Sequence, residues 1–216
     1  MPAVTTAMIK ALRDATNAGM MDAKKALEAN DGDLEKSKDW LRQKGITKAA
    51  ERAGRHAGQG VIATYVHKAT AEGSQWAGSV GVLVEVNSES DFVARNDIFQ
   101  NLARELALQV AGGSPLYVRR EEVPAALVER ERDVAMAQAR EQGKEKFADK
   151  MVEGKLNSFF GEICLLDQVY LKDPSRKVKD IVAEAVAQLK ENIVVSRFVR
   201  FEVGQSPTVD VTAGEE

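Results

Sequence analysis

The clearest alternation of apolar and other residues in this chain lies in residues 80–86. Every second position from Val80 to Val86 is valine, and the positions between them hold glycine, leucine and glutamate. A period of two is typical of a strand with one buried face. The polar residues 87–91 that follow favour a turn. Asn96 can then cap a helix whose apolar stripe comprises Phe99, Leu102, Ala103, Leu106 and Val110.

Phe92 lies in the stretch between that strand and that helix, flanked by Asp91 and Val93. We therefore predict that it sits between elements rather than within one. An aromatic residue held between rigid elements either fills the protein's own core or binds a partner. The pattern of residues alone leaves both interpretations open.

The N-terminal residues 1–54 are predicted to form a compact helical domain with a connector. Thr5 or Thr6 can cap a first helix, and Asp22 can cap a second. The inward face of the first helix is expected to carry Met8, Leu12 and Ala15. The residues at positions 16–19 are expected to separate the two helices.

A third helix is expected over residues 33–43, after a turn at 30–32. Its inward face is expected to carry Leu34, Ser37 and Leu41. A basic helical connector is expected to follow over residues 46–55. The resulting core is very small, so its stability depends on tight packing or on docking to something else.

Residues 55–204 are predicted to form an α+β core. Two strands are expected at 61–68 and 80–87, paired as a loose antiparallel hairpin through a linker at 69–77. Residues 193–203 are extended and can supply the third strand of a small antiparallel sheet. In that segment Val195, Val199, Phe201 and Val203 alternate with Ser196, Arg200 and Glu202.

Helices are predicted to pack around this sheet. Pro124 suits the first turn of a long helix that Gly143 ends. A further helix carries Phe147, Met151, Leu156 and Phe159 and is expected to stop at Gly161, and a last one has the stripe Val178, Ile181, Val182, Ala185 and Leu189. Residues 205–216 are polar and acidic at the tip, so we expect a disordered tail.

Composition limits the kinds of partner that this protein can have. Of the 216 residues, 44% are hydrophobic and 29% charged, as in an ordinary globular protein, and the formal net charge is −3. That balance argues against nucleic acid as the main partner. Apolar runs are too short for a membrane span, and the single cysteine, Cys164, fits a reducing compartment. We therefore expect a cytoplasmic protein or, in a eukaryote, one that is lodged in an organelle after processing.

The residues offer little support for catalytic chemistry. His56 and His67 are the only histidines, and neither has a second metal ligand at useful spacing. Phosphate-binding loops, dinucleotide-binding glycine patterns and nucleophile elbows do not occur in the sequence. Cys164 lies in an apolar segment, which disfavours a thiol nucleophile. We therefore expect no enzyme activity, no metal site and no cofactor.

A second conspicuous feature is the adjacent pair Met20 and Met21, directly after Gly19. Methionine adapts to irregular gaps, so the pair can fill the small helical core. Adjacent side chains at a turn do not both point inward easily, however. With Lys10 and Arg13 on the preceding helix, the pair can instead form an apolar contact surface edged with positive charge. Both interpretations stay open.

Two long motifs resemble the bacterial elongation factor Ts family, in its short form. The first is LRDATNAGMMDAKKAL at residues 12–27, and the second is NSESDFVARN at 87–96. The family's usual forms are TGAGMMD and ETDFV, so here Asn17 replaces a glycine and Ser90 replaces a threonine. Asn tolerates left-handed backbone angles and Ser90 keeps the hydroxyl group, so both motifs are preserved. The resemblance covers nearly the whole chain up to Gly204.

This resemblance implies a ubiquitin-associated-like (UBA-like) three-helix domain at the N-terminus and a guanine-nucleotide exchange factor that binds EF-Tu, both GDP-bound and nucleotide-free. It implies that Phe92 and Asp91 reach the nucleotide domain of EF-Tu near its Mg²⁺ site, in a turn shaped by Ser90 and Val93. It further implies a contact patch on the same domain, formed by Lys10, Arg13, Met20 and Met21.

Short members of the family often self-associate through the core. A homodimer that forms a two-to-two complex with EF-Tu is therefore expected. The main alternative function is a UBA-type adaptor that binds peptides through Met20 and Met21. That alternative gives no function to Asp91 and Phe92.

Overall fold

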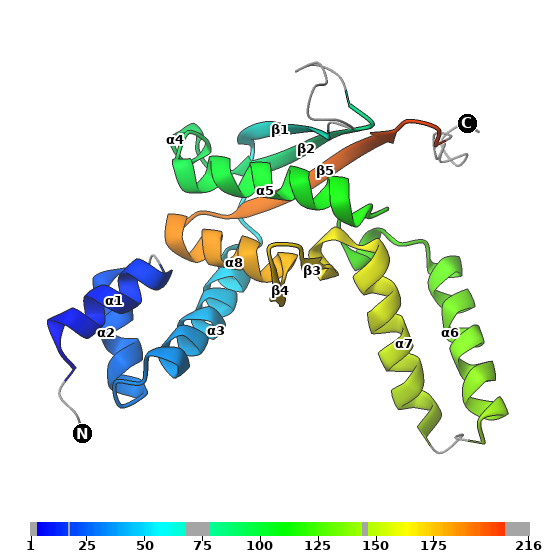
Figure 1. Cartoon of the computed structure of the whole chain (residues 1–216), viewed down its shortest axis with the longest axis horizontal. Coiled ribbons are helices and arrows are strands. Elements are labelled where there is room, and N and C mark those ends of the chain that lie inside the picture. The colour runs from blue at the N-terminus through cyan, green and yellow to red at the C-terminus, as the bar shows by residue number, and fades with distance from the viewer. Residues whose placement is uncertain (1–3, 17, 68–77, 144–146, 206–216) are drawn as a thin grey trace.

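The structure, a computed structural model, has the α+β architecture expected from the sequence (Figure 1). It describes residues 4–16, 18–67, 78–143 and 147–205. Helices pack against a small antiparallel sheet of three strands within this part of the chain. The predicted linker at 69–77 and, apart from Gln205, the predicted tail lie outside the described residues.

The N-terminal unit consists of α1 (Thr6–Thr16), α2 (Met20–Ala29) and the first half of α3 (Leu34–Arg52). Its core is as small as predicted and is made of the fully buried side chains Leu12, Ala23, Ala26 and Leu27. The Ser37 hydroxyl is also fully buried and donates to the Ala26 carbonyl oxygen at 3.1 Å, which links α3 to α2. The Thr5 hydroxyl accepts from the Met8 amide at 3.3 Å and so caps α1, as expected.

Four details of this unit differ from the sequence-based prediction. Ala15, expected on the inward face of the first helix, is exposed. Helix α2 begins at Met20 with Gly19 as its N-cap, so Asp22 lies in the first turn rather than at the cap. Leu34 is the first residue of α3 and is exposed. The predicted third helix and the predicted connector form one continuous helix, because α3 packs along α8 and Gly45 approaches Ala187 there. Tertiary packing of this kind stabilises a helix across a glycine.

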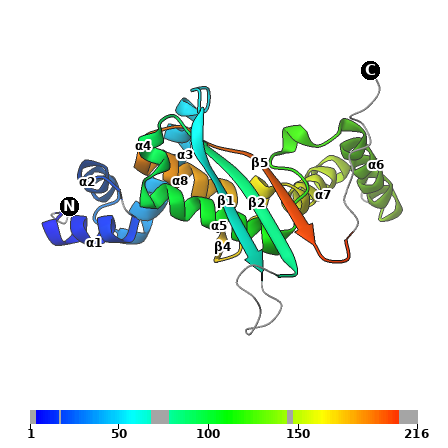
Figure 2. The same cartoon turned by 90° about the horizontal axis from the view of Figure 1, so that it is seen from above.

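The main sheet contains β1 (Gln59–His67), β2 (Val80–Ser88) and β5 (Ile193–Glu202), in the order β1-β2-β5. All three strands agree with the predicted segments, and both pairings are antiparallel. Helix α5 (Asp97–Gly113) covers one face of the sheet, and α8 (Val178–Leu189) packs beneath α5 (Figures 1 and 2). The predicted apolar stripes of β2 and α5 meet in this core.

An irregularity in β5 changes which of its side chains face the core. Val86 pairs with Val195, but the preceding Glu85 pairs with Arg197, so Ser196 is an extra residue in the ladder. An extra residue reverses the inward and outward alternation of the strand beyond it. Val199, Phe201 and Val203 are consequently exposed, and they do not continue the buried face to which Val195 belongs.

The remaining elements extend the core on the side opposite to the N-terminal unit. Helices α6 (Ala125–Glu141) and α7 (Ala148–Ile163) form a projecting hairpin (Figure 1). Pro124 and Gly143 flank α6 as predicted, whereas α7 continues past the predicted stop at Gly161. Short elements complete the described chain: α4 (Asp91–Ala94), η1 (Arg120–Glu122), η3 (Leu165–Asp167), β3 (Val169–Tyr170) and β4 (Asp173–Lys177).

An ion pair with a buried carboxylate joins two of these short elements, η1 and η3. The Asp167 carboxylate is almost fully buried and accepts from Nε and Nη2 of Arg120, both at 2.8 Å. The Lys179 ammonium group lies 3.5 Å away from the same carboxylate. Burial alone would raise the pKa of Asp167, but the hydrogen bonds and charges of Arg120 and Lys179 outweigh it and hold that pKa below the usual value.

We predict that Asp167→Asn lowers the free energy of unfolding by about 3 kcal/mol, because it leaves Arg120 without its buried partner. The folded-state pKa of Asp167 is lowered. The difference in free energy of unfolding between the wild type and the variant should therefore be at its full value above about pH 5 and should shrink as the solution is acidified. Urea unfolding at several pH values measures both effects. Asp149→Asn, at the exposed start of α7, is the matched control. An advantage that does not change with pH would contradict the prediction.

Candidate functional site

The Phe92 side chain stands out from the folded chain. It is 81% exposed, whereas the neighbouring side chains of Val93 and Ala94 are buried in the main core. The prediction that Phe92 lies between elements is wrong in detail, because residues 91–94 form the single-turn helix α4. The interpretation that this ring fills the core is therefore wrong, and the ring faces outward.

The α4 turn is held at both ends. Ser90 is its N-cap, and the Ser90 hydroxyl oxygen accepts from the Val93 amide at 3.3 Å. At its other end, Asn96 caps α5 by accepting from the Ile98 amide at 2.9 Å, as predicted. Asp91 is exposed and pairs with Arg95 at 2.9 Å; exposed pairs of this kind contribute little to stability. The Asp91 carboxylate is therefore available for a polar contact outside the chain.

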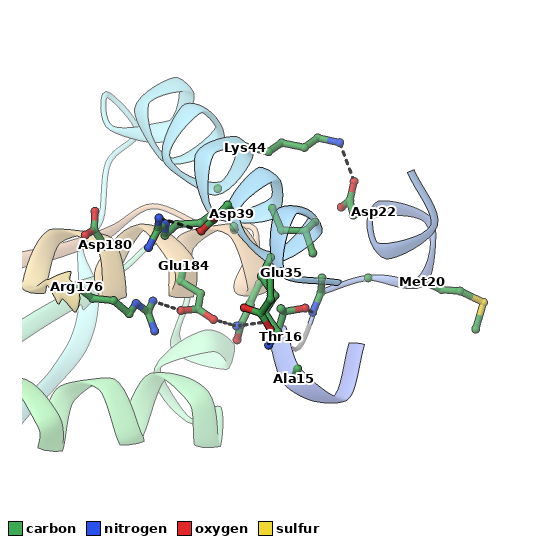
Figure 3. A pocket seen from close by; sticks show the side chains of 18 of the residues that line it. Ala15, Thr16, Met20, Asp22, Glu35, Asp39, Lys44, Arg176, Asp180 and Glu184 are labelled. Atoms are coloured by element: carbon green, nitrogen blue, oxygen red, sulfur yellow. Dashed lines mark hydrogen bonds and ion pairs between the residues drawn. The ribbon is translucent and has the colours of Figure 1, made fainter. Parts of the chain in front are cut away.

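Met20 and Met21 are also exposed, at 59% and 63%. They open α2, and the core of this unit is filled by alanine and leucine residues instead. The interpretation of the pair as core filler is therefore wrong. Both residues also line the groove described below, and Figure 3 shows the Met20 side chain extending outward from α2. Lys10 and Arg13 are exposed on α1, which packs against α2.

The two predicted groups of contact residues lie on different elements. Residues 90–93 belong to α4 and its N-cap, whereas Lys10, Arg13, Met20 and Met21 belong to the N-terminal unit. Figures 1 and 2 both place α4 and the α1–α2 pair at the same end of the molecule. The structure thus brings the residues of each group onto one unit and leaves the two groups on separate surfaces.

A groove that the sequence did not predict lies between the N-terminal unit and the core (Figure 3). Its volume is about 790 Å³, and its walls come from α3, α8, β4 and the α1–α2 region. Ion pairs join charged groups along it, including Lys44 with Asp22 at 3.0 Å and Arg176 with Glu184. The Gln188 amide donates to the Thr16 carbonyl oxygen at 3.2 Å and ties the two units together.

A further contact that the sequence did not predict supports the α4 turn. The Glu191 carboxylate, 101 residues away in sequence, accepts from the Ser90 hydroxyl at 2.6 Å. Sequence reasoning misses it because the segments meet only in the folded sheet. No short motif marks Glu191 as a neighbour of Phe92.

Reactive groups are not gathered in the part of the chain that the structure describes. Burial raises the pKa of the Cys164 thiol to about 11, so it stays protonated at neutral pH. Within the described ranges, no group of three or more His, Cys, Asp or Glu side chains could hold a metal ion. No helix among those residues is long and apolar enough to cross a membrane.

The fold and this site define a class of α+β protein that carries exposed apolar side chains, such as Phe92, Met20 and Met21, on ordered helices. A family model described as "Elongation factor TS" matches residues 8–205. Elongation factor Ts of Carboxydothermus hydrogenoformans is 49% identical over 203 residues, which cover 94% of this chain and 90% of that protein. Elongation factor Ts of Nitratidesulfovibrio vulgaris is 48% identical over 203 residues, covering 94% and 98%. The chain therefore belongs to the elongation factor Ts family, and it is a translation elongation factor.

Proposed function

We propose that this protein is the guanine-nucleotide exchange factor for EF-Tu. It binds EF-Tu·GDP and promotes the release of GDP by disturbing the Mg²⁺ and phosphate site of that protein. Membership of the family supports the partner, and the outward-facing Phe92 ring supports the mechanism. A phenylalanine that stays exposed on an ordered turn contributes little to the stability of its own chain, and its apolar surface is free to be buried by a partner.

Exchange follows from coupling between two binding sites on EF-Tu. If the factor binds nucleotide-free EF-Tu more tightly than the GDP-bound form, it must weaken GDP binding by the same ratio. Phe92 inserts into an apolar pocket beside the Mg²⁺ site, Asp91 makes an adjacent polar contact, and Ser90 and Val93 shape the turn. Burying one phenylalanine contributes about 1.5–3 kcal/mol, or one to two powers of ten in affinity. Contacts made by other residues must therefore supply the rest of the free energy that is needed to displace Mg²⁺ and the phosphate groups of GDP.

The N-terminal unit provides a second contact with the same nucleotide domain. In this proposal residues 1–54 act as a UBA-like domain that binds through Lys10, Arg13, Met20 and Met21. The exposure of both methionines supports an apolar contact there. It also favours the alternative of a peptide-binding adaptor, but that alternative does not use Phe92. An exchange factor retains EF-Tu in a pull-down and loses it when excess GDP and Mg²⁺ are added, whereas an adaptor does not.

We also propose that two copies associate through the outer face of the main sheet, giving a two-to-two complex with EF-Tu. This face is opposite to α5 and carries exposed apolar side chains from all three strands, namely Ile62, Val66, Leu83, Val199 and Phe201. Contiguous apolar surface of this kind is typical of an interface. The Phe201 side chain is 66% exposed and lies on the edge strand β5, close to its C-terminal end and opposite Gly81.

We expect Phe92→Ala to lower the maximal rate of stimulated GDP release at least tenfold, while changing the half-saturating concentration less. The reason is that the ring acts mainly after the complex has formed, and its burial corresponds to about one to two powers of ten. Stopped-flow release of a fluorescent GDP from purified EF-Tu measures both quantities. Phe147→Ala removes a similarly exposed ring from the start of α7 and serves as the control. An unchanged maximal rate would count against the insertion of Phe92.

Replacing both Met20 and Met21 by alanine should change the half-saturating concentration rather than the maximal rate, which is the opposite of the effect expected for Phe92→Ala. We expect the half-saturating concentration to rise roughly tenfold, with a nearly unchanged maximal rate, because interface side chains of this size contribute about 1–2 kcal/mol to binding. The same release assay separates the two parameters. Leu171→Ala, at an exposed leucine on the core, is the control. A fall in maximal rate alone would show that the pair is not a simple binding surface.

Replacing Phe201 by glutamate should convert the dimer into a monomer, because two like charges would be buried against apolar side chains. Light scattering at several protein concentrations measures the mass. Phe147→Glu introduces the same charge on the α6–α7 hairpin and should leave the mass unchanged. A wild-type protein that stays monomeric at every concentration would contradict the proposed dimer.

A further inference from the structure

The short turn between α8 and β5 lies against the base of the α4 turn. Helix α8 ends at Leu189, and Lys190 follows in the left-handed region with φ of 62°. Glu191 and Asn192 then lead directly into β5 at Ile193. The side chains of Glu191 and Asn192 face two different parts of the molecule, so this turn acts as a junction.

Glu191 makes two hydrogen bonds to a single residue of the α4 turn. Its carboxylate accepts from the Ser90 backbone amide at 3.0 Å and from the Ser90 hydroxyl at 2.6 Å. A serine hydroxyl has one hydrogen to donate and two lone pairs to accept with. Because Glu191 takes the hydrogen, the oxygen lone pairs are left to accept from the Val93 amide. Glu191 therefore fixes the orientation in which Ser90 caps α4.

This cap is decisive because α4 is only four residues long. A helix of one turn gains almost nothing from its own hydrogen bonds and depends on its cap and its packing. The buried side chains of Val93 and Ala94 pack α4 against the core. The exposed Phe92 ring adds little to that packing. The direction in which Phe92 points thus depends on the Ser90 cap.

The same junction reaches the end of α3 through Asn192, which is almost fully buried. Its side-chain amide donates to the carbonyl oxygens of Arg55 at 2.7 Å and Ala53 at 3.4 Å, just after the end of α3. Its backbone amide donates to the Glu89 carboxylate at 2.6 Å, next to Ser90. The end of α3 and the start of the α4 turn are therefore bonded to one residue.

We infer that Glu191 is the positioning residue for Phe92, and that the Glu191–Asn192 junction links the Phe92 turn to α3. This inference rests on the proposed exchange function. Glu191 acts through Ser90 and does not itself touch the nucleotide site of EF-Tu. By holding α4 in one conformation, it reduces the ordering that Phe92 would otherwise undergo on binding. Free and bound forms of the turn then differ little.

The first test is Glu191→Gln, which keeps the size of the side chain but removes one of the two accepting oxygens. We expect the maximal rate of stimulated GDP release to fall about tenfold, the ratio that corresponds to the loss of one hydrogen bond to a charged group. The half-saturating concentration should change less than the rate. Glu141→Gln, at the exposed end of α6, removes the same charge as a control. A wild-type rate in Glu191→Gln would overturn the inference.

A double-mutant cycle separates positioning of Phe92 from a general structural effect. In a Phe92→Ala background, Glu191→Gln should have little further effect on the maximal rate, because the side chain that it positions is gone. An equal loss in both backgrounds would overturn the inference. Ser90→Ala, which removes the same hydrogen bond from the other side, should reproduce the loss. Ser90→Thr keeps the hydroxyl and should lose less of the rate than Ser90→Ala.

Amide hydrogen exchange tests the junction without EF-Tu. Glu191→Gln and Ser90→Ala should speed exchange at residues 93–95 while leaving the amides of α5 protected. Unchanged protection at 93–95 in both variants would overturn the inference. If the wild-type chain fails to accelerate GDP release, the proposed function is wrong. The amide hydrogen exchange measurement still decides whether Glu191 orders the α4 turn. Should Glu191→Gln fail to fold, Ser90→Ala decides in its place.

Discussion

The packing of α5 against one face of the three-stranded sheet determines where the other parts of this molecule lie. The valines of β2 meet the apolar stripe of α5, including the fully buried Phe99, in a single core. Because α5 covers only one face, the other face keeps its apolar side chains in contact with solvent. Residues 89–96 connect the end of β2 to the start of α5, and within them α4 forms a tight turn at the edge of the core. Both proposed interaction surfaces of the core, the Phe92 turn and the outer sheet face, follow from this one arrangement.

The features that could be predicted from the sequence are those set by neighbours in the chain. The alternation in β2, the Asn96 cap and the stripe of α5 are local patterns, and the structure confirms them. The features that could not be predicted depend on distant segments. Val199 and Phe201 face outward because Ser196 is an extra residue opposite β2. Helix α3 is continuous because α8 supports it, and Glu191 reaches Ser90 only after folding. The resemblance to a known family identified the candidate contact residues, whereas the residues alone left Phe92 and the methionine pair ambiguous.

In the proposed function, the two contact surfaces on EF-Tu must be held at a fixed separation for their binding energies to act together. The structure contains a continuous path between them. Met20 and Met21 open α2, α2 packs on α3, and the end of α3 is bonded through Asn192 to the base of the Phe92 turn. A rigid connection of this kind lets binding at one surface favour the correct orientation at the other. The ion pair of Arg120 and Asp167 lies on the far side of the core. It joins η1 to η3, and the Arg120 guanidinium group also lies over the Phe160 ring of α7.

The order of strands also has a consequence for synthesis on the ribosome. The central strand β2 obtains its second partner, β5, only near the C-terminal end of the described chain. While the intervening helices are being translated, one edge of β2 carries unpaired backbone groups beside an apolar face. Strand edges in that state pair readily with other chains. The unpaired edge of β2 is therefore open to misassociation until β5 has been synthesised, while docking of α5 on the β1–β2 hairpin covers only the apolar face.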